Sequence, residues 1–351
     1  MTALIRLNIN ELPWSLGDGP DGGAEGLFEN TSQPNPSPFS IDLNQLSLNR
    51  YPDPDYMSLR SGLAEAYGLD PNQVTLANGS DELIWLSLSV LLQAGDALVT
   101  HAPTFAEYER IATLRGAKTV YAPIENDLST SLTNLLTIAR RCGAKLVVIC
   151  RPNNPTGELL PLPELKAFLD AYEGYVLLDE AYIEFSGEAA LPSNLLLAYP
   201  NLIVLRTFSK AYGLAGIRLG YSFASKAITA LFNAQRPPYN INAMTAYIGE
   251  KALGNIPYFE TRITAIIKER DRIEAKLAAL GISFIPSFAN FILLTSLSNG
   301  AALSGTNAAG LLKLKGFIVR AFTEECLSHC IRFSIGTPTE NDAFLEVLQT
   351  L

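Results

Sequence analysis

The sequence predicts an α/β protein: a large domain built on a mostly parallel sheet, followed by a smaller α+β domain. Two observations lead to this prediction. Short, unbroken apolar runs alternate with helical segments as far as residue 224, and after Pro237 and Pro238 the pattern changes to long helices and short strands. Strands without polar alternation are typical of parallel sheets with both faces covered. A chain of 351 residues is long enough for two domains.

The large domain, placed at residues 41–242, is expected to alternate strands and helices. A capping signal before an apolar run predicts a helix at 80–92, and a second helix is expected at 105–115. Short β-rich apolar runs predict the strands, at 97–101, 119–124, 146–150, 176–178 and 203–206. Because the last three strands end in polar segments, a ligand crevice is expected beyond their carboxyl ends.

The smaller domain is placed at residues 243–351. It begins with a helical stretch at 243–280 that is interrupted at 254–257. Short strands are expected at 283–285, 291–294, 317–320 and 331–335, with one helix between the middle two and another at the C-terminus. Residues 1–40 are expected to form an N-terminal arm that packs on this domain. Within the arm, the Gly- and Pro-rich segment 14–39 indicates a mobile lid or linker.

Composition narrows the function classes. The formal net charge is −9, from 26 basic and 35 acidic residues, and no cluster of Lys and Arg stands out, which argues against nucleic-acid binding. With 48 % hydrophobic and 17 % charged residues, the chain can bury a large core. The apolar runs are shorter than the ~18–20 residues of a membrane span, and the N-terminus does not resemble a signal peptide. A small metabolite is therefore the expected partner.

The four cysteines lack the spacing of a disulfide framework, which favours reduced thiols and a cytoplasmic protein; they are Cys142, Cys150, Cys326 and Cys330. Cys326, His329 and Cys330 lie close together, but the sequence supplies no matching second half of a metal site. No metal is expected.

Charged and polar residues that suit catalysis lie at or just after the ends of the predicted strands. Lys210 lies just past a buried strand, where a lysine is unusual for a solvated surface charge. Asp179 ends another apolar strand, where an unpaired carboxylate would be costly. Asn154 follows a third strand, and Arg218 lies eight residues beyond the lysine. Three separate segments therefore converge on one crevice.

These residues lie in motifs that resemble the pyridoxal-phosphate aminotransferases of fold type I, the aspartate-aminotransferase-like fold. The motifs are NGSDE (78–82), NNPTG (153–157), DEAY (179–182) and SKAYGLAGIRLGY (209–221). Within that group the chain is similar to the histidinol-phosphate aminotransferases, through LNINELP (7–13), RYPDP (50–54), GFIVR (316–320) and IRFSIGT (331–337). The resemblance covers nearly the whole chain in the right order.

The resemblance implies pyridoxal 5'-phosphate as cofactor. Lys210 would supply the amine that bonds it and later move the proton between the substrate Cα and the cofactor C4′. Asp179 would keep the ring nitrogen protonated. Asn154 and Tyr182 resemble the pair that hydrogen-bonds the phenolic oxygen. A turn or helix cap is the alternative interpretation of Asp179, and ordinary packing that of Tyr182.

The cofactor phosphate needs amide donors at a helix N-terminus. NGSDE opens a predicted helix, so the amides of Ser80, Asp81 and Glu82 can point at a phosphate while their side chains turn away. The two acidic side chains also suit the positive end of the helix dipole. Taken alone, this motif would more often be a plain helix cap.

The resemblance adds further members to the phosphate site. Thr207 and Ser209 would complete the cradle, and Arg218 would supply its positive charge. Tyr51 corresponds to a tyrosine that reaches the phosphate of the neighbouring subunit, which implies a homodimer with shared active sites.

Two aromatic residues are candidates for contact with the cofactor ring. Phe105 and Tyr108 follow the strand at 97–101 and can stack on the ring or line its pocket. Core packing is an equally good interpretation of either one.

Two arginines are the candidates for substrate binding. Arg332 resembles the arginine that grips the substrate carboxylate across this fold, and Arg320 is placed to assist. A guanidinium fork suits carboxylate and phosphate alike, although a salt bridge within the small domain is the alternative for each. Leu12 stands where the family commonly has a second Asn, which puts substrate preference in doubt.

The resemblance implies a transferase that converts L-histidinol phosphate and 2-oxoglutarate to imidazole-acetol phosphate and L-glutamate in histidine biosynthesis, by a ping-pong mechanism. Three alternatives stay open: a threonine-phosphate decarboxylase, a broad-specificity aromatic aminotransferase and, more distantly, a regulatory protein without catalysis. The intact Lys210 and Asp179 argue against the last.

Overall fold

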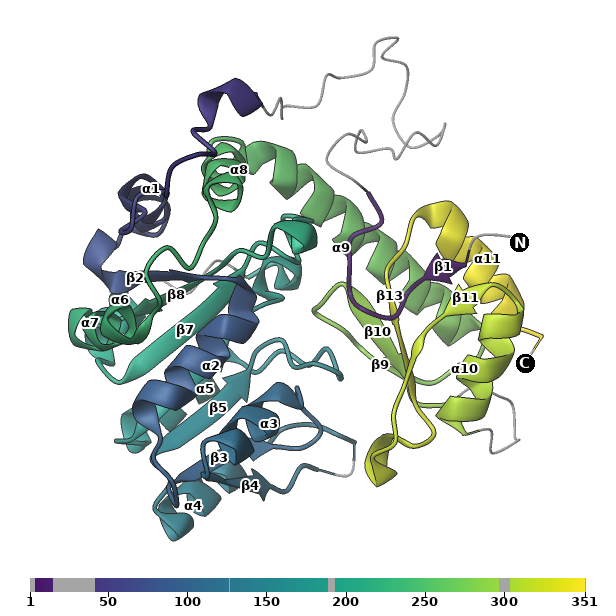
Figure 1. The fold of residues 1–351 in the computed structure, drawn as a ribbon. Helices are drawn as coiled ribbons and strands as arrows, with labels where there is room; N and C mark the ends of the chain where they lie inside the picture. The colour runs from purple at the N-terminus through teal and green to yellow at the C-terminus, as the bar shows by residue number, and fades with distance from the viewer. Residues whose placement is uncertain (1–3, 15–41, 126, 189–192, 297–303, 351) are drawn as a thin grey trace. The chain divides into compact units, whose positions relative to one another are not determined.

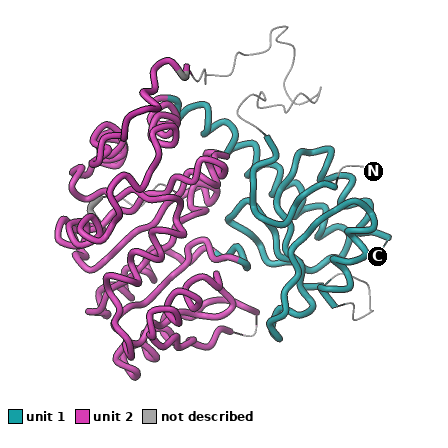
Figure 2. Tube along the Cα trace, in the orientation of Figure 1, with its two compact units in different colours: residues 1–40, 155–158, 255–351 teal, residues 41–154, 159–254 magenta. Residues whose placement is uncertain are grey.

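The computed structural model describes residues 4–14, 42–125, 127–188, 193–296 and 304–350 (Figure 1). The chain forms two compact units (Figure 2). Unit 1 comprises residues 1–40, 155–158 and 255–351, and unit 2 comprises residues 41–154 and 159–254. None of the helices in the described ranges combines the length and the apolar character that crossing a bilayer requires.

The described strands of unit 2 form one seven-stranded sheet in the order β2-β8-β7-β6-β5-β3-β4 (Figure 1). Its strands are β2 (Val74–Ala77), β3 (Ala97–His101), β4 (Lys118–Ala122), β5 (Leu146–Cys150), β6 (Tyr175–Asp179), β7 (Leu202–Thr207) and β8 (Gly220–Ala224). All neighbours are parallel except β8, which is antiparallel to both β7 and β2. The mostly parallel sheet expected from the sequence is confirmed.

The described residues of unit 2 also form helices. They are α1 (Met57–Tyr67), α2 (Gly79–Leu91), α3 (Glu107–Leu114), α4 (Leu132–Cys142), α5 (Leu162–Ala171), α6 (Ser193–Ala198), α7 (Lys226–Gln235) and α8 (Ala243–Leu253). Every residue of β5 and β7 is buried. Because successive side chains of a strand point to opposite faces, both faces of the sheet are covered.

Unit 1 contains a four-stranded antiparallel sheet in the order β12-β13-β10-β9 and a parallel pair, β1-β11. The strands are β1 (Ile5–Arg6), β9 (Phe284–Ile285), β10 (Phe291–Leu294), β11 (Phe317–Ile318), β12 (Arg320–Ala321) and β13 (Ile331–Ser334). The helices are α9 (Ile256–Ala279), α10 (Gly305–Leu314) and α11 (Pro338–Leu348). The first residues of the chain therefore pair with a strand near its end.

Several elements differ from the sequence expectation. The region 317–320 is two strands, because the chain leaves the partner β1 and joins β13 at Val319. The antiparallel strand β8 was not expected, since it opens with Gly220 and carries polar residues. The compact units divide after α8, at 254/255, because α8 packs on α1. Most of the expected lid, residues 15–39, lies outside the described residues.

Candidate active site

Three adjacent strands of unit 2 bring the predicted cofactor segments together. In register, Cys150 of β5 is paired with Asp179 of β6, and Asp179 with Leu205 of β7. Parallel strands end at the same edge of a sheet. The segments that follow carry Asn154 and Lys210, so these two residues emerge at the edge where Asp179 ends its strand.

Asp179 is a buried carboxylate with two hydrogen-bond donors. Its Oδ2 accepts from the hydroxyl of Tyr108 at 2.7 Å, and its Oδ1 accepts from the backbone N–H of Ala181 at 3.1 Å. Burial raises the pKa of Asp179 to about 6, and the Tyr108 hydrogen bond opposes that rise. A positively charged partner at this position would stabilise the ionised form.

Lys210 lies in the turn after β7. Its Nζ is 5.5 Å from the centroid of the Tyr182 ring, which is itself buried. The amine and the phenol are therefore neighbours at the edge of the sheet. Asn154 approaches from β5, and its backbone N–H bonds the Cys150 sulfur next to Asp179. Asn153 ties this segment to the end of β3, since its side chain donates to the Pro103 carbonyl at 3.0 Å.

In the described part of the chain, the side chain of the N-cap residue Asn78 does not cap the N-terminus of α2. Instead Glu82 reaches back and accepts from the Asn78 backbone N–H at 2.5 Å, and Asn240 also donates to the Glu82 carboxylate, at 3.2 Å. The Glu82 side chain is thus turned toward Asn78 and Asn240. The Asp81 carboxylate does not turn away from the cation expected to bind the phosphate, because it bonds Arg218.

Arg218 lies over this helix end. Its guanidinium bonds the Asp81 carboxylate at 3.0 Å and the Ser209 hydroxyl at 3.3 Å, and it is half exposed. The Thr207 hydroxyl accepts from the backbone N–H of Ser209 at 3.1 Å, which fixes the turn between them. A cation, hydroxyls and the positive end of a helix dipole are groups of the kind that bind anions such as phosphate.

Two glycines make this arrangement possible. Gly79 has φ +80°, and a Cβ there would lie 2.5 Å from Nη2 of Arg218. A Cβ on Gly220 would lie 2.6 Å from the Ser80 nitrogen. Only glycine fits these close approaches of side chain and backbone. No role for either residue follows from the sequence pattern alone, although both stand inside the quoted motifs.

The predicted aromatic residues occupy different surroundings. Tyr108 is fully buried behind Asp179, whereas Phe105 is half buried and meets Tyr108 edge-on, with ring centroids 5.7 Å apart. Phe105 is therefore the more accessible ring of the two. Tyr51 is 80 % exposed and stacks on Tyr239 at 4.6 Å.

In unit 1, the two predicted substrate arginines lie directly opposite each other. Arg320 of β12 pairs in register with Arg332 of β13, so both side chains leave the same face of the sheet. Arg332 is buried, donates to the Asn8 carbonyl at 3.0 Å and lies 5.0 Å over the Phe291 ring. Arg320 is exposed. Two like charges opposite each other are unfavourable unless an anion joins them.

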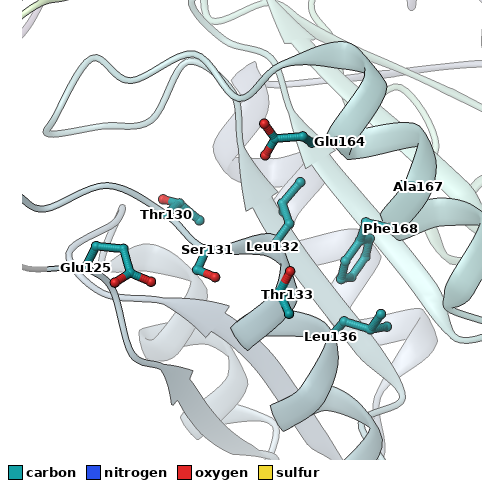
Figure 3. A pocket seen from close by; sticks show the side chains of 9 residues that line it. All are labelled: Glu125, Thr130, Ser131, Leu132, Thr133, Leu136, Glu164, Ala167 and Phe168. Carbon is teal, nitrogen blue, oxygen red and sulfur yellow. The ribbon is translucent and has the colours of Figure 1, made fainter.

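A separate cavity of about 410 Å³ lies between α4 and α5 (Figure 3). Its lining includes two acidic residues, Glu125 and Glu164, and none of the predicted site residues. The described residues contain no cluster of three His, Cys, Asp or Glu side chains that could hold a metal ion.

Comparison with known proteins identifies the family. Residues 10–348 match the family model described as aminotransferase class I and II. The chain belongs to this aminotransferase family. The histidinol-phosphate aminotransferase of Roseiflexus castenholzii is 35 % identical over 99 % of this chain and 89 % of that protein. The enzyme of the same name from Thermococcus gammatolerans is 37 % identical over 99 % of this chain and 92 % of that protein.

Solved structures agree with the fold of this aminotransferase. The histidinol-phosphate aminotransferase of Sinorhizobium meliloti, in complex with pyridoxal-5'-phosphate, superposes with a TM-score of 0.84 at 26 % identity, covering 99 % of this chain and 90 % of that one. An L-threonine-O-3-phosphate decarboxylase from Porphyromonas gingivalis shares the fold at TM-score 0.74 and 24 % identity, covering 86 % and 90 %. The resemblance and the fold class predicted from the sequence are confirmed.

The predicted residues of the aminotransferase fall into separate groups. In unit 2 one group holds Asp179 and Tyr108, a second holds Lys210 and Tyr182, and a third surrounds Arg218 at the start of α2. Tyr51 is paired instead with Tyr239, through the stacking of their rings. The substrate arginines lie in unit 1.

Proposed function

We propose that this aminotransferase uses pyridoxal 5'-phosphate to convert L-histidinol phosphate and 2-oxoglutarate to imidazole-acetol phosphate and L-glutamate, a step of histidine biosynthesis. The observation that carries the proposal is that the segments bearing Lys210, Asp179 and Arg218 lie at one edge of the unit 2 sheet. Relatives that bear the histidinol-phosphate aminotransferase name over nearly the full chain support the choice of substrate.

The residues present fit the cofactor. The open N-terminus of α2 and the half-exposed guanidinium of Arg218 suit its phosphate. The buried Asp179 carboxylate, with its raised pKa, suits a protonated ring nitrogen, because a neighbouring positive charge favours its ionised form. Lys210 supplies the amine, and Phe105 the accessible aromatic face.

The bound cofactor would supply an electron sink for the carbanion at the substrate Cα. The side chains divide the remaining work. Lys210 would hold the cofactor through its amine and would carry the proton to and from the substrate Cα. Asp179 would hold the proton on the ring nitrogen, and Asn154 and Tyr182 would hydrogen-bond the phenolic oxygen. Arg218 and the α2 amides orient the whole group through its phosphate.

Substrate recognition is assigned to the two arginines of unit 1. Arg320 and Arg332 are paired in register on neighbouring strands, and guanidinium groups suit a carboxylate or a phosphate monoester. One pair can therefore take glutamate in one half-reaction and histidinol phosphate in the other. The arm helps to place Arg332, because the Asn8 carbonyl accepts a hydrogen bond from its guanidinium.

The partner of the chain is assigned as a second copy of itself. Tyr51 and Tyr239 form an exposed aromatic stack, and the segment holding Tyr51 is anchored where the Tyr56 hydroxyl bonds the Ile241 backbone. An exposed aromatic pair favours an interface. Tyr51 would reach the phosphate of the neighbouring subunit, as the resemblance implies.

The shared site has a direct test. Lys210→Ala and Tyr51→Ala variants, each inactive alone, are unfolded together, refolded and assayed. If the sites are shared, a mixed dimer contains one intact site and activity returns to about a quarter of wild type. Refolded mixtures that stay inactive, or an active monomer in sedimentation, would contradict the assignment.

The compartment is assigned as the cytoplasm. All four cysteines are described and free, which fits a reducing environment. Fractionation of the source cells, followed by immunodetection, tests this assignment.

The function is tested by absorbance of the purified protein with histidinol phosphate and no keto acid. We expect the visible band of the bound cofactor to give way to the near-ultraviolet band of its amino form. Response to phenylalanine alone would indicate an aromatic aminotransferase, and release of CO₂ from threonine phosphate would indicate the decarboxylase. No visible band after added pyridoxal phosphate would contradict the cofactor itself and leave the non-catalytic regulator.

A further inference from the structure

A buried carboxylate lies on the face of the sheet opposite to Asp179. Glu180 follows Asp179 directly, and its backbone N–H continues the strand ladder by donating to the Leu205 carbonyl at 3.0 Å. Consecutive residues of an extended strand point to opposite faces. The Glu180 side chain has 0 % exposure, so it occupies the interior behind the site.

The two oxygens of Glu180 each meet a guanidinium from a neighbouring strand. Oε2 lies 2.6 Å from Nη2 of Arg206 in β7, and Oε1 lies 3.5 Å from Nη1 of Arg151, which directly follows β5. Both arginine side chains are buried, with 2 % and 1 % exposure. One carboxylate therefore bridges the two strands on either side of its own.

The bridge has further anchors on each side. Arg151 donates through Nε to the Leu160 carbonyl at 2.7 Å and pairs with Glu188. Arg206 lies 3.5 Å from Glu184 and 5.3 Å from the centre of the Tyr67 ring, outside the bridge itself. Each guanidinium thus has further contacts besides the one with Glu180.

A bridge of this kind is expensive in free energy. Desolvating buried ions costs several kcal/mol each, and apolar residues of similar volume often serve stability as well or better. The best-attested benefit of such groups is a unique spatial register. Here the bridged positions stand three residues before Asn154, one after Asp179 and four before Lys210.

We propose that Glu180 is a positioning residue of the active site, which uses Arg151 and Arg206 to fix the relative placement of the strand ends bearing Asn154, Asp179 and Lys210. The inference rests on the proposed function for its catalytic consequence. Glu180 acts from behind the sheet and does not touch cofactor or substrate. Its effect is to hold the amine, the ring-nitrogen partner and the phenolic-oxygen partner at fixed separations.

The test compares Glu180→Gln with Glu188→Gln. Both substitutions remove one carboxylate that pairs with Arg151, but Glu188 is 40 % exposed and lies outside the bridge. For Glu180→Gln we expect kcat to fall at least tenfold with KM changed less than threefold, and the visible band of the bound cofactor to shift. Glu188→Gln should stay within twofold of wild type in kcat and keep its band.

A second readout needs no cofactor. The backbone N–H of Arg151 bonds the Asp179 carbonyl at 2.8 Å, beside the bridge, whereas that of Val176 bonds the Asn201 carbonyl at the opposite end of β6, on the side of β7. In cofactor-free Glu180→Gln, hydrogen exchange at Arg151 should accelerate at least tenfold while Val176 keeps its protection. Equal acceleration at both ends would show a purely global loss of stability and overturn the proposal.

Two further outcomes are decisive. If Glu180→Gln does not fold, Glu180→Asp carries the test, since it keeps the charge with a shorter reach and should lower kcat by a smaller factor. Wild-type kcat and an unmoved band in a folded Glu180 variant would overturn the proposal. A wild-type protein that binds no cofactor would instead overturn the proposed function, while the hydrogen-exchange result would still decide whether the bridge fixes the strand ends.

Discussion

The hydroxyl of Tyr108 donates a 2.7 Å hydrogen bond to Oδ2 of Asp179, and both side chains are buried. The tyrosine comes from α3 and the aspartate from the end of β6, 71 positions later in the chain. Burial raises the pKa of Asp179 to about 6 from the ordinary value of 3.8, and the hydrogen bond limits that rise. The pair therefore sets the charge at the position assigned to the cofactor ring nitrogen.

Asp179→Asn is expected to stabilise the cofactor-free protein at pH 8. The folded-state pKa of Asp179 lies above its ordinary value, so this carboxyl contributes stability below pH 4 that is lost as the pH rises through 6. The loss amounts to about 3 kcal/mol on the scale of 1.4 kcal/mol per pKa unit. Asparagine is uncharged at every pH, so the variant should not show this loss of stability.

Thermal unfolding of the cofactor-free proteins at pH 4 and pH 8 checks this expectation. The variant should unfold at a higher temperature than wild type at pH 8 and at a similar temperature at pH 4. Transamination should be lost, because the amide cannot hold the ring-nitrogen proton. A variant less stable than wild type at pH 8 would show that the buried, ionised Asp179 carboxylate does not destabilise the folded protein.

Tyr108→Phe is expected to raise the pKa of Asp179 further, because it removes the hydroxyl that favours the ionised form. Binding of pyridoxal phosphate should weaken as the pH falls, with a midpoint about one unit higher than in wild type. Fluorescence titrations with pyridoxal phosphate between pH 5 and 8 measure this midpoint. Tyr172→Phe is the matched control, since its hydroxyl bonds the Ala144 carbonyl away from the site. An unmoved midpoint would rule out this role.

Gly79→Ala is expected to weaken cofactor binding at least tenfold, because the new Cβ would displace the Arg218 guanidinium. Gly95→Ala provides the control. Gly95 has φ +90°, close to the +80° of Gly79, but a Cβ there would meet no atom of the described residues within 4 Å. Both variants should lose about 1 kcal/mol of stability from backbone strain. If Gly79→Ala and Gly95→Ala bind the cofactor equally well, Arg218 does not contribute to phosphate binding.

Arg332→Gln is expected to lower kcat/KM for glutamate and for histidinol phosphate at least a hundredfold, since the buried guanidinium is assigned to the substrate anion. Cofactor affinity should stay within twofold, because the residues proposed to bind the cofactor lie in unit 2. Steady-state kinetics and cofactor titration measure the two effects.

Arg320→Gln tests the other member of the pair. It removes one of two facing like charges and should stabilise the ligand-free protein by about 0.5 kcal/mol at low salt. It should also raise KM for both substrates. A stability loss at low salt would show that the two guanidinium groups do not repel each other.

The sequence was most informative where a local pattern decides the structure. The strands β3, β5 and β10 have the bounds expected from their apolar runs. The same pattern places Lys210 and Asp179 at strand ends, and the resemblance supplies their roles. These features depend on neighbours along the chain, which a sequence displays directly.

Contacts between residues that lie far apart in the sequence could not be predicted from such local patterns. The facing of Arg320 and Arg332 follows from the register of two strands, and the contact of Tyr108 with Asp179 follows from the packing of α3 on the sheet. The need for glycine at 79 appears only when Arg218 is seen above it. Tertiary packing decides such contacts, and no short-range pattern encodes them.

The pairing of β1 with β11 also determines the order in which parts of the chain can fold during synthesis. Asn10 bonds the Ser334 hydroxyl across 324 positions of sequence. Ribosomes add about 5–20 residues per second, so the arm waits tens of seconds for its partners. The described strands of the sheet that precedes Lys210 and continues into β8 have all emerged once β8 is made, whereas Arg332 gains its contact with Asn8 only after residue 332 has been added. In a nascent chain, the residues proposed to hold the cofactor can therefore assemble before those proposed to bind the substrate.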